Sequence, residues 1–263
     1  MRQQTCYIAG NVTASRSSTM AAPRIYTAQP LIPGTTLELS GQPALHVTQV
    51  LRLRTGAALR VFDGKGQECE ATLQTTGRRG ITVLTGATIQ GPAEPKLDIM
   101  LAQGIARHDR MDLILQKAVE LGVSTIQPLW MQRSQSHLKG ERLEKRLQHW
   151  QGVIISASEQ CGRNTLPALL PATGFLEWLQ AGSDAALKLM LQPGSPHALP
   201  SLQQPDGRIL LLVGPEGGLN SDEQDAALAA GFTGLRLGQR ILRTETAALA
   251  ALAGMQMLWG DYR

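Results

Sequence analysis

The chain has 263 residues, of which 43% are hydrophobic and 17% are charged, and its formal net charge is +4. This balance is typical of a globular protein, and the length predicts two domains of ordinary size. A membrane protein is excluded, because no apolar run approaches the roughly 18 residues that a spanning helix needs. The cysteines, Cys6, Cys69 and Cys161, lie far apart without a C-x-x-C pair, which indicates neither disulfides nor zinc and favours a cytoplasmic location.

The charge is unevenly distributed along the chain. Residues 1–90 hold nine Lys or Arg against four Asp or Glu, a difference of +5, whereas residues 91–263 hold sixteen against seventeen, a difference of −1. A basic unit beside a nearly neutral one favours docking on a polyanion such as RNA. A solvated basic face without any partner is the alternative interpretation.

The N-terminal part predicts an extension followed by a small β-barrel. Residues 1–22 are polar, rich in Ser and Thr and without the apolar stretch of a signal peptide, so we expect a disordered extension. Residues 23–90 alternate short β-type segments with turn signals, which predicts a small barrel. A short helical piece at 46–53 interrupts this pattern, and we expect His46 to be a core or capping residue.

Several basic side chains of this barrel are candidate RNA contacts. A single arginine is more often solvated or paired with a nearby carboxylate than bound to a phosphate, but a cluster of them favours RNA binding. The candidate phosphate contacts are Arg24, Arg52, Arg54, Arg60 and Lys65.

The linker 91–95 holds two prolines and precedes a second unit, residues 96–263, in which strands and helices alternate. Such alternation predicts an α/β domain with a parallel sheet. Its first part is expected to contain strands at 97–101, 124–130 and 187–191 and helices at 109–121 and 140–160. The second helix ends in SEQCGRN (158–164), which has more hydrogen-bonding groups than a plain helix end needs, although ordinary capping at Gly162 explains it as well.

The most specific chemistry begins at the apolar run 209–213, which predicts a strand buried on both faces. GPEGG (214–218) follows at once, so the backbone can turn sharply and approach a ligand closely. We expect Ser221 to cap the next helix and Gly231 to end it. A phosphate cradle is disfavoured because no lysine follows the glycines and three carboxylates fill the first helical turn. S-adenosylmethionine, which carries no phosphate, suits the loop better.

A second loop, residues 238–243, follows a short strand expected at 235–237, with Thr244 as the predicted N-cap of the last helix. Ligands of parallel α/β sheets bind beyond the carboxyl ends of the strands, so the two loops are expected to form one site. The last helix is apolar on nearly all sides from Ala247 to Met257, which predicts burial that includes a second subunit.

Six segments together resemble the RsmE-type methyltransferases of the SPOUT superfamily. They are HVTQVLRLRTG, VFDGKGQE, DRMDLILQKAVELGV, SEQCGRN, GPEGG and LGQRILRTETAAL. Members of that family methylate N3 of a uridine in 16S ribosomal RNA with S-adenosylmethionine. The resemblance implies a PUA-like β-barrel at 23–90, a SPOUT α/β domain at 96–263 with a trefoil knot, and a homodimer that acts on 16S ribosomal RNA or the small ribosomal subunit. It also makes Met20 a candidate start of the chain.

The resemblance also implies roles for individual residues. Arg240 and Arg243 would stabilise the uridine anion or hold its phosphate, Glu216 and Glu245 are candidate bases, and Arg163 is a further RNA contact. Many relatives carry His where this chain has Gln192, which argues against a catalytic role for this side chain, although its backbone could still bind the ligand. The expected cofactor contacts are Leu191, Gly214, Glu216, Gly217, Gly218, Leu237, Gly238, Ile241, Leu242 and Thr244.

Two other functions fit parts of the sequence. A β-barrel and a glycine loop would also serve an RNA- or nucleotide-binding protein without catalysis, which would bind no S-adenosylmethionine. A SPOUT methyltransferase with a different RNA target would bind the cofactor and leave 16S ribosomal RNA unmodified.

Overall fold

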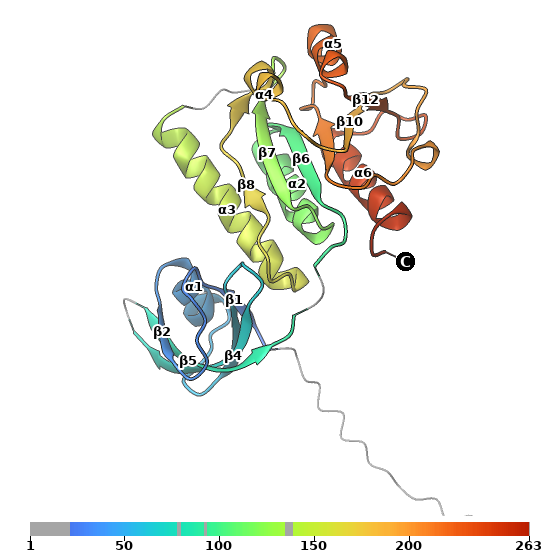
Figure 1. Cartoon of the computed structure of the whole chain (residues 1–263). Coiled ribbons are helices and arrows are strands. Elements are labelled where there is room, and N and C mark those ends of the chain that lie inside the picture. Colours follow the sequence, from blue (N-terminus) through green and yellow to red (C-terminus); the bar gives the residue numbers. More distant parts are fainter. Residues whose placement is uncertain (1–21, 78–79, 92–93, 135–138, 263) are drawn as a thin grey trace, which may run out of the picture.

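The computed structural model describes residues 22–77, 80–91, 94–134 and 139–262, which form two units (Figure 1). The predicted extension 1–22 and Cys6 fall almost wholly outside this part of the chain, as does part of the predicted linker. None of the helices within it combines the length and the apolar character that crossing a membrane requires.

The N-terminal unit is a five-stranded sheet, as the alternating segments predicted. Its strands follow the order β1-β3-β4-β5-β2, and only the β1/β3 pair is parallel. Alternate side chains such as Ile25, Leu59, Leu73 and Val83 fill its interior. Helix α1 (Gln42–Leu45) and a single π-type turn (His46–Val50) form the expected helical piece. The strands are β1 (Arg24–Tyr26), β2 (Thr36–Leu39), β3 (Ala58–Phe62), β4 (Glu68–Thr76) and β5 (Ile81–Ile89).

The C-terminal unit is built on a parallel sheet in the order β12-β10-β11-β6-β7-β8, with β9 also paired to β7. Strand β11 lies in the middle and is buried along its whole length, which confirms the prediction from its apolar run. The strands are β6 (Ile99–Gly104), β7 (Thr125–Trp130), β8 (Ala168–Leu169), β9 (Thr173–Gly174), β10 (Leu187–Leu191), β11 (Ile209–Val213) and β12 (Thr233–Leu235).

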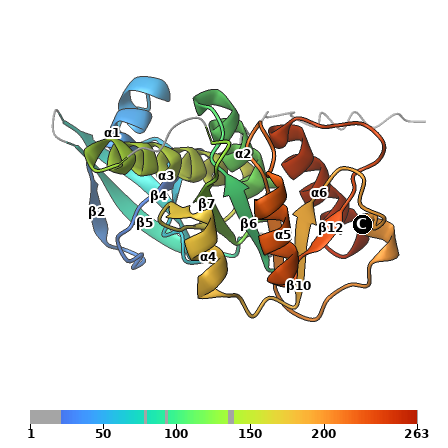
Figure 2. The same cartoon turned by 90° about the horizontal axis from the view of Figure 1, so that it is seen from above.

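Helices cover both faces of this sheet (Figure 2). One face packs against α2 (His108–Glu120), α3 (Glu141–Cys161) and α6 (Thr244–Leu258), through side chains such as Ile114, Trp150 and Leu252. The other face packs against α4 (Phe175–Ala181) and α5 (Ser221–Ala229). The result is the three-layered α/β arrangement that the alternating pattern predicted.

Three local predictions around the loops were wrong. Asn220, not Ser221, caps α5: its Oδ1 accepts from Glu223 N at 2.7 Å, and Glu223 Oε2 accepts from Asn220 N at 3.0 Å. Asn and Ser cap helices equally well, so adjacent candidates cannot be separated by type. The expected strand at 235–237 lies at 233–235, and α6 begins at Thr244, with Arg243 in the capping position.

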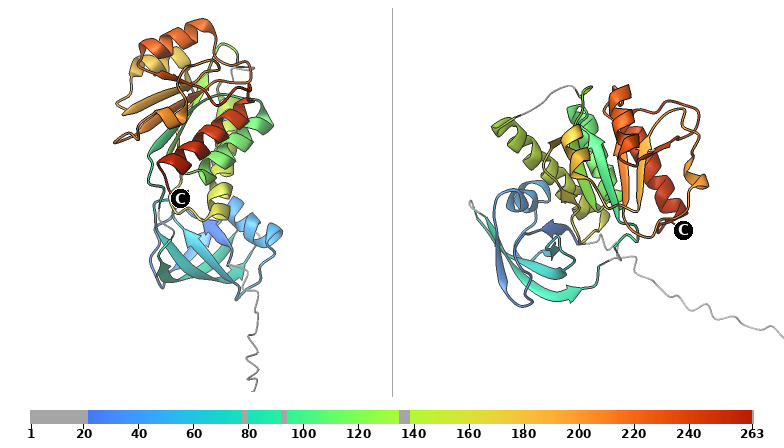
Figure 3. Two further views of the ribbon diagram at one scale, coloured as in Figure 1. Left: turned by 90° about the vertical axis from the view of Figure 1, so that its right-hand side faces the viewer. Right: turned by 45° about the horizontal axis from the view of Figure 1, so that its top comes forward.

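The two units meet where β1 approaches the C-terminal end of α3 (Figure 3). The guanidinium of Arg24 donates to Ser158 O at 2.6 Å, to Arg163 O at 3.1 Å and to Asn164 Oδ1, and it pairs with Glu68. A cation at the end of a helix satisfies its last carbonyls and opposes its dipole. With 11% of its side chain exposed, Arg24 has a structural role in this joint, which disfavours the predicted contact with a phosphate.

Arg163 has a similar structural role. It donates to Val119 O at 3.2 Å and Val123 O at 2.8 Å, at the end of α2, and only 11% of its side chain is exposed. These contacts likewise disfavour the predicted contact of Arg163 with RNA. The segment 158–164 forms the joint between the units and does not line the cavity described below.

Glu159 completes this joint and links it to His46. Its Oε1 accepts from Tyr26 N at 3.0 Å, and its Oε2 lies 3.4 Å from His46 Nδ1. Burial raises the pKa of Glu159, and the Tyr26 amide, His46 and Arg24 oppose this effect.

Candidate active site

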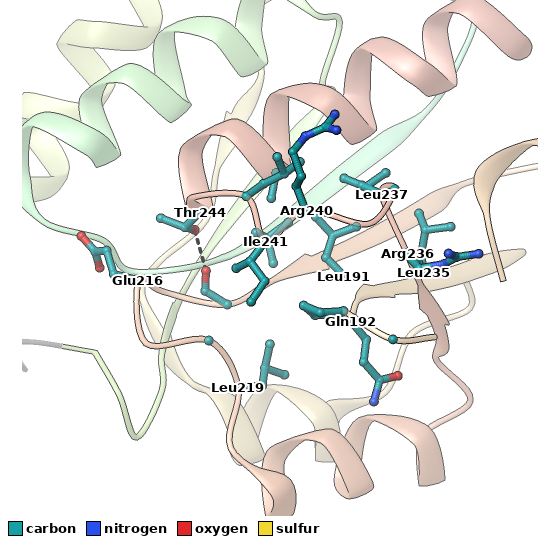
Figure 4. A pocket seen from close by; sticks show the side chains of 18 of the residues that line it. Leu191, Gln192, Glu216, Leu219, Leu235, Arg236, Leu237, Arg240, Ile241 and Thr244 are labelled. Carbon is teal, nitrogen blue, oxygen red and sulfur yellow. Dashed lines mark hydrogen bonds between the residues drawn. The ribbon is translucent and has the colours of Figure 1, made fainter. Parts of the chain in front are cut away.

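Three loops at the carboxyl ends of neighbouring strands enclose a cavity of about 700 Å³ (Figure 4). The loops follow β10, β11 and β12, which are adjacent in the sheet. The convergence of two of them was predicted from the position of ligand sites in parallel sheets. The volume lies within the range of small-molecule and cofactor sites.

The glycine loop after β11 is a tight turn in which Gly218 N donates to Pro215 O at 2.9 Å. Gly218 has φ of +67°, and space around it is open, so its backbone conformation alone requires glycine. A methyl group on Gly214 would lie 2.8 Å from Leu219 Cδ1, within the turn itself. Gly214 is therefore explained by the packing of the loop, whereas the sequence had suggested close approach to a ligand.

Two buried side chains join the glycine loop to the start of α6. Thr244 Oγ1 donates to Gly214 O at 2.6 Å, and Gln103 Nε2, from the end of β6, donates to Thr244 Oγ1 at 3.1 Å. Thr244 is 6% exposed and Gln103 is fully buried. The hydroxyl of Thr244 thus fixes the relative position of two loops instead of capping its own helix.

All ten predicted cofactor contacts line the cavity. Its walls are largely apolar, from Leu191 on one loop to Leu237 and Leu242 on another, and Ile241 is 86% exposed at its edge. The described lining residues include no lysine but two arginines, Arg236 and Arg240. Within the described chain, no three His, Cys, Asp or Glu side chains are grouped as a metal site would need.

Of the four candidate catalytic residues, two line the cavity and two do not. Arg240 lines the cavity, and Arg243 is exposed in the same loop without lining it. Glu216 lines the cavity through the glycine loop, but its carboxylate points away from Leu191 and Leu219 in Figure 4 and accepts from Arg107 N at 2.9 Å. Glu245 does not line the cavity, so the structure does not support its assignment as a base.

The structure adds two polar side chains to the site. Gln192 Nε2 donates to Gln224 Oε1 at 2.8 Å, and Gln224 Nε2 donates to Leu219 O at 3.0 Å. Both glutamines line the cavity. The sequence did not reveal Gln224, because nothing in the motifs distinguishes it from its neighbours in the first turns of α5.

The remaining RNA candidates lie on the barrel surface. Arg52, Arg54 and Lys65 are exposed, and Arg60 is 40% exposed with its Nη1 3.9 Å from Glu68 Oε1. Arg52 has φ of +52°, the only positive value among the described residues other than glycine. Their contact with RNA stays a prediction.

Comparison with known proteins identifies the family. Models for an RNA methyltransferase domain and an RNA methyltransferase PUA domain match residues 93–256 and 39–85. Ribosomal RNA small subunit methyltransferase E of Buchnera aphidicola is 31% identical over 241 residues, covering 92% of this chain and 95% of that protein. The chain belongs to the ribosomal RNA small subunit methyltransferase E family.

Solved structures of this family align along nearly the whole chain. The Neisseria gonorrhoeae methyltransferase E, bound to S-adenosylmethionine, superposes with a TM-score of 0.88 at 42% identity and covers 92% of this chain and 100% of its own. A methyltransferase from Legionella pneumophila in complex with the same cofactor also gives 0.88, at 36% identity and with 92% and 99% coverage. The barrel is thus a PUA-like domain and the α/β unit a methyltransferase domain.

Proposed function

We propose that this chain transfers a methyl group from S-adenosylmethionine to N3 of a uridine in the 16S ribosomal RNA of the small subunit. The observation that carries the proposal is the cavity between three loops, which every expected cofactor contact lines, in a chain of this methyltransferase family. When bound, the cofactor supplies an activated sulfonium methyl group.

The cavity supports this cofactor by its chemistry. Apolar walls formed by Leu191, Leu237 and Leu242 suit the adenosine, and the bend of the glycine loop at Gly218 leaves backbone groups available for hydrogen bonds. The amides of Gln192 and Gln224 offer further polar contacts. Together the three loops would exclude water from the methyl group.

The arginines of the last loop suit the chemistry at uridine. N3 of uridine carries a proton and becomes a good nucleophile only when that proton leaves, so the protein must favour the anion. We assign this role to Arg240 and Arg243, whose positive charges lie in and beside the cavity wall. Glu216 stays a candidate base on the glycine loop.

The barrel would hold the RNA. Arg52, Arg54, Arg60 and Lys65 form the basic side of the proposed RNA-binding domain, residues 23–90, next to the proposed methyltransferase domain, residues 96–263. The matched ranges 39–85 and 93–256 support these boundaries. Contacts to phosphates would position the RNA without reading its sequence.

Three further features of the proposal come from the resemblance. They are a homodimer, a trefoil knot in the C-terminal chain and a cytoplasmic location, where the small subunit is assembled. Met257 and Leu258, at the end of α6, are 59% and 38% exposed, which supports a subunit contact at this helix. Tracing the backbone of a crystal structure would test the knot.

Mass spectrometry of 16S ribosomal RNA tests the activity. RNA from a strain without the gene should lack one methyl group on one uridine, and the purified chain with S-adenosylmethionine should restore it. An unmodified 16S RNA in the parent strain, with a methylated transfer RNA instead, would favour the different-target alternative. Failure to bind S-adenosylmethionine in calorimetry would favour a binding protein without catalysis.

A further inference from the structure

One arginine of α2 lies between a glutamate of the glycine loop and a glutamate in the first turn of α6. Arg110 Nη1 is 3.7 Å from Glu216 Oε1, in the glycine loop, and Arg110 Nε is 4.0 Å from Glu245 Oε1, in the first turn of α6. The three side chains are 30%, 16% and 12% exposed, so solvent screens the interactions only in part. Arg110 does not itself line the cavity.

The guanidinium of Arg110 is a cationic partner that both carboxylates share. The second oxygens, Glu216 Oε2 and Glu245 Oε2, are buried and have no hydrogen-bond partner in the described part of the chain. Other charged residues of these elements have different contacts or are exposed. Arg107 meets Glu216 through its backbone amide, Asp112 pairs with His149 of α3 at 2.7 Å, and Asp109 and Arg243 are exposed.

We propose that Arg110 is a positioning residue for cofactor binding, which holds the glycine loop and the start of α6 at the spacing that the cavity requires. The inference rests on the proposed function, since the cavity is the cofactor site. Without the guanidinium, two partly buried carboxylates of like charge would face each other, and their repulsion would separate the loops.

Calorimetric titration of S-adenosylmethionine into Arg110→Ala tests the inference, with thermal melts of each variant to establish folding. We expect affinity to fall about tenfold relative to wild type. Lys117→Ala is the matched control, because Lys117 lies on the same helix and pairs with Glu120 at 2.8 Å. It should bind as wild type does.

Two further variants separate positioning from a general loss of structure. Arg110→Lys keeps the charge and should retain most of the affinity, and Arg110→Ala combined with Glu245→Gln removes the repulsion and should regain affinity. No recovery in the double variant would overturn the inference. So would unchanged affinity in Arg110→Ala while wild type binds normally. Failure of wild type to bind would instead overturn the proposed function, and the inference with it.

Discussion

The hydroxyl of Thr244 donates a 2.6 Å hydrogen bond to the carbonyl of Gly214, thirty positions earlier in the chain. The two residues begin, respectively, the last helix and the glycine loop, so a single short contact fixes two walls of the cavity. Gln103 donates to the same hydroxyl, which makes Thr244 both an acceptor and a donor in a buried node.

Thr244→Val should destabilise the fold, because it keeps the volume and removes the hydroxyl that donates to Gly214 O and accepts from Gln103 Nε2. The expected loss is about 1 kcal/mol in the free energy of unfolding, measured by urea denaturation, since Gln103 Nε2 still donates to Gly104 O at 2.9 Å and to Gly214 O at 3.4 Å. Thr244→Ser retains the hydroxyl and should lose much less. Equal losses for Val and Ser would contradict this role of the hydroxyl.

Gly218→Ala and Gly231→Ala should be equally destabilising and differ in cofactor binding. Both glycines have positive φ, +67° and +85°, with no atom within 4 Å of an added methyl group, and each substitution should cost about 1 kcal/mol. Only Gly218 lines the cavity, so only its variant should bind S-adenosylmethionine more weakly in calorimetry. Full affinity in folded Gly218→Ala would contradict the assignment of this loop to the cofactor.

Replacing Arg52 and Arg54 by Ala should weaken RNA binding and flatten its salt dependence. Each lost phosphate contact reduces the slope of log affinity against log salt by roughly 0.7 to 0.9. Filter binding of 16S RNA fragments at several salt concentrations measures it. Lys145→Ala, which removes an exposed charge from α3, is the control, and an unchanged slope in the arginine variant would assign both side chains to a solvated face.

Glu159→Gln should alter how stability depends on pH. Because burial raises the pKa of Glu159, its contribution to stability is present below the ordinary glutamate range and is lost as pH rises through the raised value. Glu159→Gln lacks this term, so its stability relative to wild type should increase as pH rises. Urea denaturation across this range measures it, and Glu141→Gln, whose side chain is 78% exposed, should show no such trend.

Sedimentation at micromolar concentration should show a dimer, and Met257→Glu should weaken it. Met257 is 59% exposed on α6, where a charge would be buried in the expected contact. Leu176→Glu offers a matched control, because Leu176 is 60% exposed on α4, across the sheet. A wild-type chain that sediments as a stable monomer would contradict the dimer.

The sequence predicted the fold wherever the signal was local. The apolar run 209–213 followed by glycines defined both the central strand and its loop, and Gly162 and Gly231 ended their helices with positive φ as expected. The cavity walls could be predicted for a related reason: the loops after β11 and β12 carry the motifs, and parallel strands bring such loops together.

The sequence could not reveal a partner that lies far away in the chain. Arg24 resembled any surface arginine, because its acceptors, Ser158 O and Arg163 O, are more than 130 positions distant. From the sequence, Glu245 could be either a carboxylate that stabilises the first turn of a helix or a catalytic base. In the structure, Arg110 lies beside it. Sequence periodicity and motif spacing do not predict such pairs, which form only when distant parts of the chain pack together.

The joint around Arg24 also has a consequence for target selection. This guanidinium bonds β1 to the end of α3 and so helps to fix the position of the barrel relative to the α/β unit. The enzyme would then select a nucleotide by its distance from the stretch of RNA backbone that is bound to the barrel. Two uridines with identical neighbours would be distinguished by the folded shape of the RNA around them.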